Sequence, residues 1–560
     1  MNNIIRLLLL SIYPIIILLS GLIVYRKYKD TLRNNYKNIL FNSLLAAIII
    51  AVGLVVFFKK ENTIYAYDYA GHWIRALTLR LKFFENPKEI LPLVYSSMNN
   101  MDYSFLPALF GLPFILLNQS YTFFALTNLL IFLLPTFVLL QIAYFKYLNK
   151  NRYIPLVTLL VVYPLYLTLF YGKVDCSGLL FITLGYLLVI LPDFKEIDNV
   201  DNLAVNLFMF LAIFLRRWYL YSAVCFYLSY FIKWLFHKEK KFTDLFKLLS
   251  SGIVLLIVCL LFFRPFMINT LTNNFDEAYA FYNHDGKILS FINNISPIIC
   301  VISVIGLFVL FKKDRSLLVI NIVSIVVPCL MIWKIQSFEY HHYYIFLLNI
   351  IILFVIGIEY LSKVKYAQYL LIVLLLIQPL TIFTYMGNNY IFTNIRKNPE
   401  VLENKYKLME ISEYIKSVEP DDTFTAFLSG GAYGIITDDL LRNAMLPDID
   451  FPNIDSAVFD IRDGFPKDYQ YIKYIITVDP MVYTDRNYQH MFDIISDAII
   501  NYELISSIYH PIYENTLETG HNITVYERIS DYTPEMKKYF YNEMLKYYPD
   551  KADYFSYILD

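Results

Sequence analysis

The sequence predicts a polytopic α-helical membrane protein of about 12 transmembrane helices, followed by a C-terminal extracytoplasmic α/β domain. Of its 560 residues, 58% are hydrophobic. Long apolar runs such as "LLLLSIYPIIILLSGLIVY" (7–25) reach the roughly 18 residues that can cross a bilayer. Lysine and arginine gather in alternate connections between these runs, as in other polytopic membrane proteins. After residue 386, short β-rich runs alternate with amphipathic stretches, which is typical of an α/β domain.

The transmembrane domain, residues 1–386, contains twelve apolar runs that we interpret as spans. The first run is too long for the core of a signal peptide, which favours a retained helix. The segment "FLPALFGLPFILL" (105–117) is shorter and carries two prolines, so we expect a re-entrant or interfacial piece, with a thirteenth span as the alternative. The expected spans are 5–25, 38–58, 121–145, 153–171, 176–192, 203–216, 218–235, 247–263, 297–311, 316–334, 343–361 and 367–386.

The orientation of the spans follows from the basic connections between them, because lysine and arginine in short loops stay in the cytoplasm. If the segment 105–117 does not cross the membrane, all of the basic connections lie on the same side of the bilayer. The first long loop (59–104) and everything after residue 386 are then extracytoplasmic. The basic connections are 26–37, 146–152, 233–247, 312–315 and 363–365.

The tail, residues 387–560, has the pattern of a small α/β domain. Strands are expected at "TFTAFL" (423–428), "YIKYIITV" (471–478) and "NITVYERI" (522–529). Amphipathic helices are expected at 400–418 and 486–500. The stretch "TPEMKKYFYNEMLKYY" (533–548) opens with a helix-start signal and predicts a C-terminal helix.

The composition also excludes some classes of partner. A formal net charge of −1 gives no reason to expect nucleic acid.

The five cysteines lie in or at the edges of apolar runs without paired spacing, so we interpret them as core or lipid-facing residues. No Asp-x-Asp pair with ligand-like spacing occurs in an outer loop, so we expect no cofactor, although a divalent metal stays open.

Basic residues also stand at the expected outer ends of the spans, where anchoring cations are not favoured. Each of them can instead snorkel to the lipid headgroups or pair with a nearby acid. Their recurrence at one membrane depth favours a site for the phosphate of a membrane-embedded lipid, because arginine and lysine both bind phosphate oxygens. The candidates for this phosphate site are Lys173, Arg216, Arg217, Lys334, His341 and His342.

The first outer loop contributes a carboxylate, Asp68 in "AYDYAGHW". A carboxylate near a cationic phosphate site suits a displacement reaction, in which it accepts the proton of an incoming hydroxyl while the cations stabilise the departing phosphate. The following stretch, 72–84, predicts an amphipathic helix on the membrane surface, and its His72 and Arg75 are candidates for contacting substrate. Asp68 can alternatively be a helix cap or a partner of Arg75, and His72 a structural residue.

These motifs resemble the C-type superfamily of integral membrane glycosyltransferases, which includes protein O-mannosyltransferases and lipid A aminoarabinose transferases. The resemblance covers about residues 38–386. It rests on "AYDYAGHW", on an acid before a small-residue helix in "GKVDCSGLLFITLGYLL" (172–188), on "RRWYLYSAVCF" (216–226) and on "EYHHYYIFLL" (339–348). It implies that Asp68 is the catalytic base. The family often has paired acids in this loop, whereas Tyr69 follows here, so Asp102 and Asp175 are the candidates for a second acidic role.

The resemblance implies a polyprenyl-phosphate-linked sugar as donor and an extracytoplasmic acceptor, which is an envelope glycan, a lipid or a protein. Direct displacement at the anomeric carbon would invert its configuration. The expected location is a bacterial plasma membrane, with the active site on the extracytoplasmic side. Three alternatives remain: a transporter or flippase of lipid-linked sugars that performs no chemistry, a polysaccharide ligase or polymerase, and a non-catalytic scaffold whose exported domain is the functional part.

Overall fold

The computed structural model places the chain in two compact units. One unit comprises Met1–Lys60, Gly71–Asn274 and Tyr282–Asn398, and the other, which we call the C-terminal unit, comprises Glu61–Ala70 and Pro399–Asp560. The residues that the structure describes are 2–100, 103–148, 151–272, 292, 295–335, 341–364, 366–384, 399–418, 426–432, 434–449, 451–456, 472–482 and 490–559.

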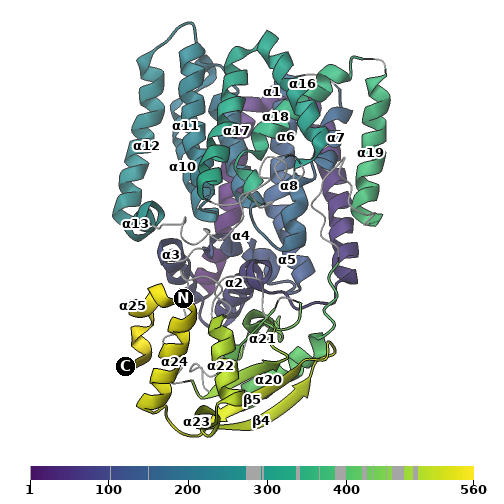
Figure 1. The fold of residues 1–560 in the computed structure, drawn as a ribbon. Helices are drawn as coiled ribbons and strands as arrows, with labels where there is room; N and C mark the ends of the chain where they lie inside the picture. Colours follow the sequence, from purple (N-terminus) through teal and green to yellow (C-terminus); the bar gives the residue numbers. More distant parts are fainter. Residues whose placement is uncertain are drawn as a thin grey trace. The chain divides into compact units, whose positions relative to one another are not determined.

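The first unit is built almost entirely of helices (Figure 1). A helical segment occupies each of the twelve stretches that the sequence predicts as spans. The main helices are α1 (Asn2–Lys60), α2 (Tyr67–Glu85), α3 (Ile90–Asn100), α4 (Leu106–Ile115), α5 (Tyr121–Asn128), α6 (Leu134–Tyr147), α7 (Tyr153–Val161), α8 (Pro164–Leu167), α9 (Cys176–Gly185), α10 (Asn199–Leu215), α11 (Tyr219–Phe236), α12 (Phe242–Phe262), α13 (Arg264–Thr272), α16 (Pro297–Lys313), α17 (Arg315–Ile335), α18 (Leu347–Leu361) and α19 (Ala367–Thr384).

Helix α1 contains both of the first two expected spans. Its backbone is not helical at Tyr28, where φ is −115° and ψ is 20°. The guanidinium of Arg6 donates to the carbonyl oxygens of Phe83 and Phe84 on α2, at 3.0 and 2.8 Å. The other end of α1 leads to the segment before α2, so α1 doubles back at Tyr28, and Figure 1 shows its two purple legs. The two expected spans are therefore two helical legs joined at Tyr28.

Several of these helices can cross a membrane. Four described helices, Asn2–Lys60, Tyr121–Tyr147, Phe242–Phe262 and Arg315–Ile332, are long and apolar enough by length and composition. The pair Tyr153–Val161 and Pro164–Tyr171 would be a fifth span, broken by a bend of 58°. The apolar side chains of α12 are largely exposed, as expected where lipid takes the place of protein. The chain is thus a polytopic helical membrane protein, and the count of twelve spans stays a prediction.

Helix α4 occupies the short proline-containing segment whose crossing the sequence leaves open. Its 10 residues rise about 15 Å, roughly half of the hydrocarbon core of a bilayer. Nearly all of its side chains are buried in protein. Both features suit a re-entrant or internal helix better than a thirteenth span.

The second unit contains a five-stranded mixed sheet with the order β2-β1-β3-β5-β4. Strand β1 pairs in parallel with β2 and β3, whereas β5 pairs antiparallel with β3 and β4. The expected strands and helices all form, with shifted ends. The elements are α20 (Lys405–Val418), β1 (Ala426–Ser429), α21 (Asp438–Asn443), β2 (Ile454–Ser456), β3 (Tyr474–Asp479), α22 (His490–Asn501), α23 (Glu503–Ser506), β4 (Tyr509–Thr516), β5 (Asn522–Arg528), α24 (Pro534–Tyr547) and α25 (Ala552–Phe555).

Each face of this sheet carries its own hydrophobic core, because side chains alternate along a strand. Phe427 and Ile475 pack with α22 and α24 on one face. Ala426, Leu428 and Ile476 belong to the core on the other face, together with residues of α20 and α21.

The second core also includes a segment from far away in the sequence. Ile64 and Ala66 belong to it, with exposed fractions of 5% and 1%. The stretch Glu61–Ala70 therefore folds with the C-terminal unit, although the sequence led us to place the whole first loop in the transmembrane domain.

Candidate functional site

The turn that carries Lys173 and Asp175 is held in a defined shape. Gly172 has a φ of 62°, a left-handed conformation that glycine adopts without strain, and it reverses the chain before Lys173. Asp175 then precedes α9. A Cβ at Gly178 would lie 2.2 Å from the ring of Tyr219, so only glycine lets this ring approach α9. The Tyr219 hydroxyl donates to the Asp175 carbonyl at 2.6 Å.

Asp175 forms a buried ion pair with Arg216, which follows the last turn of α10. The Arg216 Nε lies 2.8 Å from the Asp175 Oδ1, and the side chains are only 5% and 3% exposed. In the part of the chain that the structure describes, the buried Oδ2 of Asp175 has no hydrogen-bond partner. The structure thus brings Asp175 and Arg216 together. The role of Asp175 as a second acid stays a prediction.

Lys173 contacts His341, the first of two adjacent histidines in the turn before α18. Its Nζ lies 3.1 Å from His341 Nδ1. An ammonium group can only donate, so Nδ1 accepts, and the imidazole proton of His341 is assigned to Nε2. The rings of His341 and His342 lie 4.1 Å apart, and His342 also meets the ring of Trp218 edge-on at 4.9 Å.

Hydrogen bonds to neighbouring elements hold the histidine turn in place. The Ser222 hydroxyl on α11 donates to the Ile345 carbonyl at 2.6 Å. The Tyr344 hydroxyl donates to the Leu165 carbonyl at 2.7 Å and lies 2.8 Å from the Thr168 hydroxyl. The two histidines are therefore positioned by α8 and α11 as well as by their own turn.

Tyr103 is a member of this site that the sequence did not indicate. Its ring lies 5.0 Å from the guanidinium carbon of Arg216 and 5.3 Å from that of Arg75. The ring of His72 meets it edge-on at 5.3 Å, and the Nε of Arg75 donates to its carbonyl at 3.2 Å. Tyr103 thus links the candidates on α2 to those near α10. We define the cation cluster as Lys173, Asp175, Arg216, His341 and His342, with Tyr103, His72 and Arg75 beside it.

The cation cluster is buried and electropositive. Lys173 and Arg216 are cations, and Asp175 is an anion, so these three groups together carry a net positive charge. His341 lies in the connection between α17 and α18, outside the expected spans. Burial lowers the pKa of His341, and the neighbouring His342, Lys173, Arg216 and His72 lower it further. His341 is therefore neutral at pH 7, and such a cluster favours an anionic ligand.

The remaining predicted residues are placed as follows. The guanidinium carbon of Arg217 lies 5.3 Å from the ring of Phe266, and the residue is partly exposed. Asp102 and the side chain of Lys334 fall outside the described residues. Among the residues that are described, no three or more His, Cys, Asp or Glu side chains form a group that could hold a metal ion.

Asp68 lies in the first turn of α2 and is half-buried. A carboxylate there is favoured by the helix dipole. Asp68 stands four residues before His72 in the same helix, so the two residues share a helix face. Tyr67, which begins α2, has a φ of 51°. This conformation costs a residue other than glycine about 1–3 kcal/mol, and the surrounding structure must hold it.

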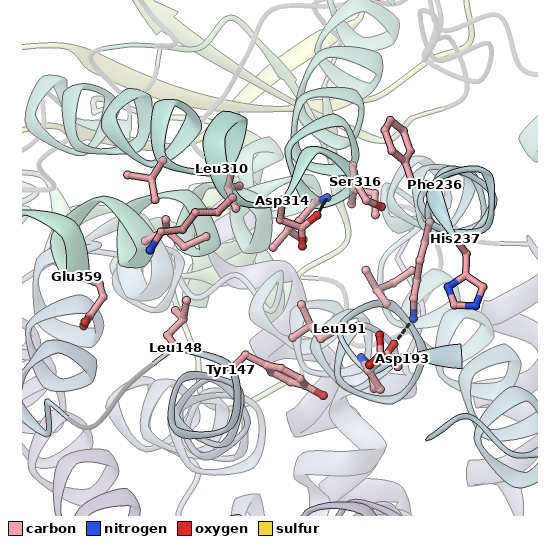
Figure 2. A pocket seen from close by; sticks show the side chains of 18 of the residues that line it. Tyr147, Leu148, Leu191, Asp193, Phe236, His237, Leu310, Asp314, Ser316 and Glu359 are labelled. Atoms are coloured by element: carbon pink, nitrogen blue, oxygen red, sulfur yellow. Dashed lines mark hydrogen bonds between the residues drawn. The ribbon is translucent and has the colours of Figure 1, made fainter. Parts of the chain in front are cut away.

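A pocket of about 510 Å³ lies elsewhere in the first unit (Figure 2). Lys233 is among its lining residues and donates to the carbonyl oxygens of Val189, at 2.7 Å, and Pro192. Lys313 and Lys363 also line the pocket and belong to connections that the sequence predicts as cytoplasmic. None of the predicted site residues lines this pocket, so it is distinct from the cation cluster.

The comparisons with known proteins concern the fold. No protein-family model and no curated protein matches the sequence. The crystal structure of ArnT from Cupriavidus metallidurans in the apo state is 10% identical, with a TM-score of 0.47, and covers 85% of this chain and 97% of that chain. ArnT from the same organism bound to undecaprenyl phosphate is 8% identical, with a TM-score of 0.48 and the same coverage. ArnT is a lipid A aminoarabinose transferase, one of the relatives that the sequence motifs resemble.

Proposed function

We propose that this chain is a membrane glycosyltransferase that transfers a sugar from a polyprenyl-phosphate donor to an acceptor outside the cytoplasm. The observation that carries the proposal is the buried cation cluster. Lys173, Arg216 and the two histidines come from three separate turns: Lys173 contacts His341, the two histidine rings lie 4.1 Å apart, and Arg216 pairs with Asp175. Burying charge is costly, and a binding site for an anion gives a reason for burying the cations Lys173 and Arg216 together.

The donor phosphate would bind at the cation cluster. Lys173 would supply a compact point charge, and the guanidinium of Arg216 would donate to phosphate oxygens. A neutral His341 would donate from Nε2. Positive charge at this point stabilises the phosphate as the glycosidic bond breaks.

Asp68 would act as the general base. It would accept the proton of the acceptor hydroxyl while the acceptor oxygen bonds to the anomeric carbon. The bond from that carbon to the phosphate oxygen would break, and polyprenyl phosphate would leave with the electron pair. Attack opposite the leaving group would invert the anomeric configuration. His72, one turn further along α2, and Arg75 would lie on the acceptor side. The active site would face the extracytoplasmic side.

The test is sugar transfer by the purified protein with polyprenyl-phosphate sugars, detected as released polyprenyl phosphate. Asp68→Asn removes the proton acceptor and should lower turnover about 10²–10⁴-fold while donor binding is retained. Glu85→Gln is the matched control, because Glu85 is an exposed acid in the last turn of the same helix and should be dispensable. Near-normal transfer by a well-folded Asp68→Asn variant would refute the assignment of the base. Lipid movement without cleavage of the donor would favour a flippase.

A further inference from the structure

The segment that leads into α2 is held at consecutive residues by the C-terminal unit. Asn62 forms a parallel bridge with Val401. The Asn62 N–H donates to the Glu400 carbonyl, and the Asn62 carbonyl accepts from the Leu402 N–H, both at 2.9 Å. The ammonium of Lys405 donates to the Asn62 Oδ1 at 3.1 Å. The chain just after α1 is thus extended against the start of the C-terminal unit.

The next residues of this segment are buried in the unit's own core. Ile64 and Ala66 pack with Leu408, Ile436 and Leu440. Between them, the Tyr65 carbonyl accepts from the Asn443 Nδ2 at 3.0 Å, and Asn443 is the last residue of α21.

Helix α21 also holds the first residue of α2. The Tyr67 N–H donates to the Asp439 Oδ2 at 2.7 Å. Tyr67 is the residue with a φ of 51°, so this hydrogen bond is made in a conformation that its side chain disfavours. Arg442 lies 2.8 Å from both Asp438 and Asp439 and fixes the carboxylate that accepts from Tyr67.

We infer that the C-terminal unit sets the position of Asp68, with Asp439 as the positioning residue that fixes the start of α2. The inference rests on the proposed function, because it concerns the position of the proposed general base, Asp68. A backbone hydrogen bond at the first residue of a helix holds the first turn of that helix. The contact with Asp439 therefore determines where the first turn, and the carboxylate of Asp68, is placed.

The acids of α21 provide a matched comparison. Asp438 and Asp439 are adjacent and both pair with Arg442, but the Tyr67 N–H donates to the carboxylate of Asp439. Asp439→Ala removes the acceptor. Asp439→Asn keeps an oxygen that can accept from the Tyr67 N–H. Asp438→Ala removes a charge and an Arg442 contact without touching that bond.

The experiment measures turnover, donor affinity and hydrogen exchange of residues 62–69 in the full-length protein. Asp439→Ala should lower kcat about 10- to 100-fold with unchanged donor affinity, because displacement of a catalytic group by about 1 Å is costly. Exchange in 62–69 should accelerate. Asp439→Asn should recover most of the turnover and protection, and Asp438→Ala should stay within about twofold of the parent protein.

Three results would overturn the inference. The first is normal turnover in Asp439→Ala while Asp68→Asn is inactive, which would leave the proposed function standing. The second is an equal loss in Asp438→Ala and Asp439→Ala, which would trace the effect to Arg442 and the general stability of the unit. If Asp68→Asn itself transfers sugar normally, the assignment of the base fails, and the inference fails with it.

Discussion

The buried ion pair between Arg216 and Asp175 allows a quantitative prediction about the cation cluster. At the observed 2.8 Å and an effective dielectric constant of about 20, the attraction is about 6 kcal/mol before desolvation. Desolvation of two charges offsets most of this gain. Removing one partner leaves the other charge buried, so Arg216→Met and Asp175→Leu should each lower the free energy of unfolding by about 3–5 kcal/mol.

The double variant Arg216→Met/Asp175→Leu should be far more stable than the sum of the single changes suggests. Two apolar side chains replace a buried pair, and such replacements are often neutral, so we expect a cost of no more than about 1–2 kcal/mol. Unfolding in detergent, followed for all four members of the cycle, measures the coupling. The double variant should remain folded and yet bind the donor weakly, because it lacks the guanidinium. Additive losses, or strong donor binding by the folded double variant, would refute this reasoning.

The other predictions concern helix packing and pH. A Cβ at Gly306 on α16 would lie 2.0 Å from the Leu353 carbonyl oxygen of α18, so Gly306→Ala should lower the free energy of unfolding by about 1–3 kcal/mol or more. Gly21→Ala is the control: a Cβ there would meet nothing within 4 Å, so this change should be neutral or stabilising. Melting in detergent distinguishes the two, and equal effects would contradict the close packing. The pKa of His341 is lowered in the folded protein. The unfolded chain therefore binds a proton at His341 more readily than the folded chain does. The free energy of unfolding should fall as the pH decreases below about 6.5, by up to about 1.4 kcal/mol per pH unit. His341→Gln should show a shallower pH dependence of melting than the parent protein, and an unchanged slope would be evidence against a neutral buried imidazole.

The sequence predicts the helices and strands well where local patterns determine them. Each long apolar run became a helix, because its length and composition suffice. Strand β4 was missed for a physical reason: Pro511 interrupts its pattern at a bulge, and its side chains are mostly exposed or half-buried. Strand β2 has only three residues, too few for a recognisable alternation.

The candidate site was predictable in part. The basic residues at the expected outer turns pointed to Lys173, Arg216, His341 and His342, and the structure brings these four together. Tyr103 carries no charge and belongs to no motif, so only its contacts with residues distant in the sequence identify it. Glu61–Ala70 is part of the C-terminal unit through contacts such as the β-bridge between Asn62 and Val401. These residues are far apart in the sequence, so no local pattern predicts their pairing.

The central claim is that the buried cation cluster binds the phosphate of the lipid donor, and the most direct test is the affinity for polyprenyl monophosphate. Lys173→Gln should weaken binding about 10- to 100-fold, the value of a hydrogen bond to a charged group. Lys82→Gln, at a lysine of α2 that pairs with Glu89, is the control and should leave the affinity unchanged. A polyprenol without phosphate should bind both variants and the parent protein equally. Unchanged affinity of a folded Lys173→Gln variant for the monophosphate would contradict the claim.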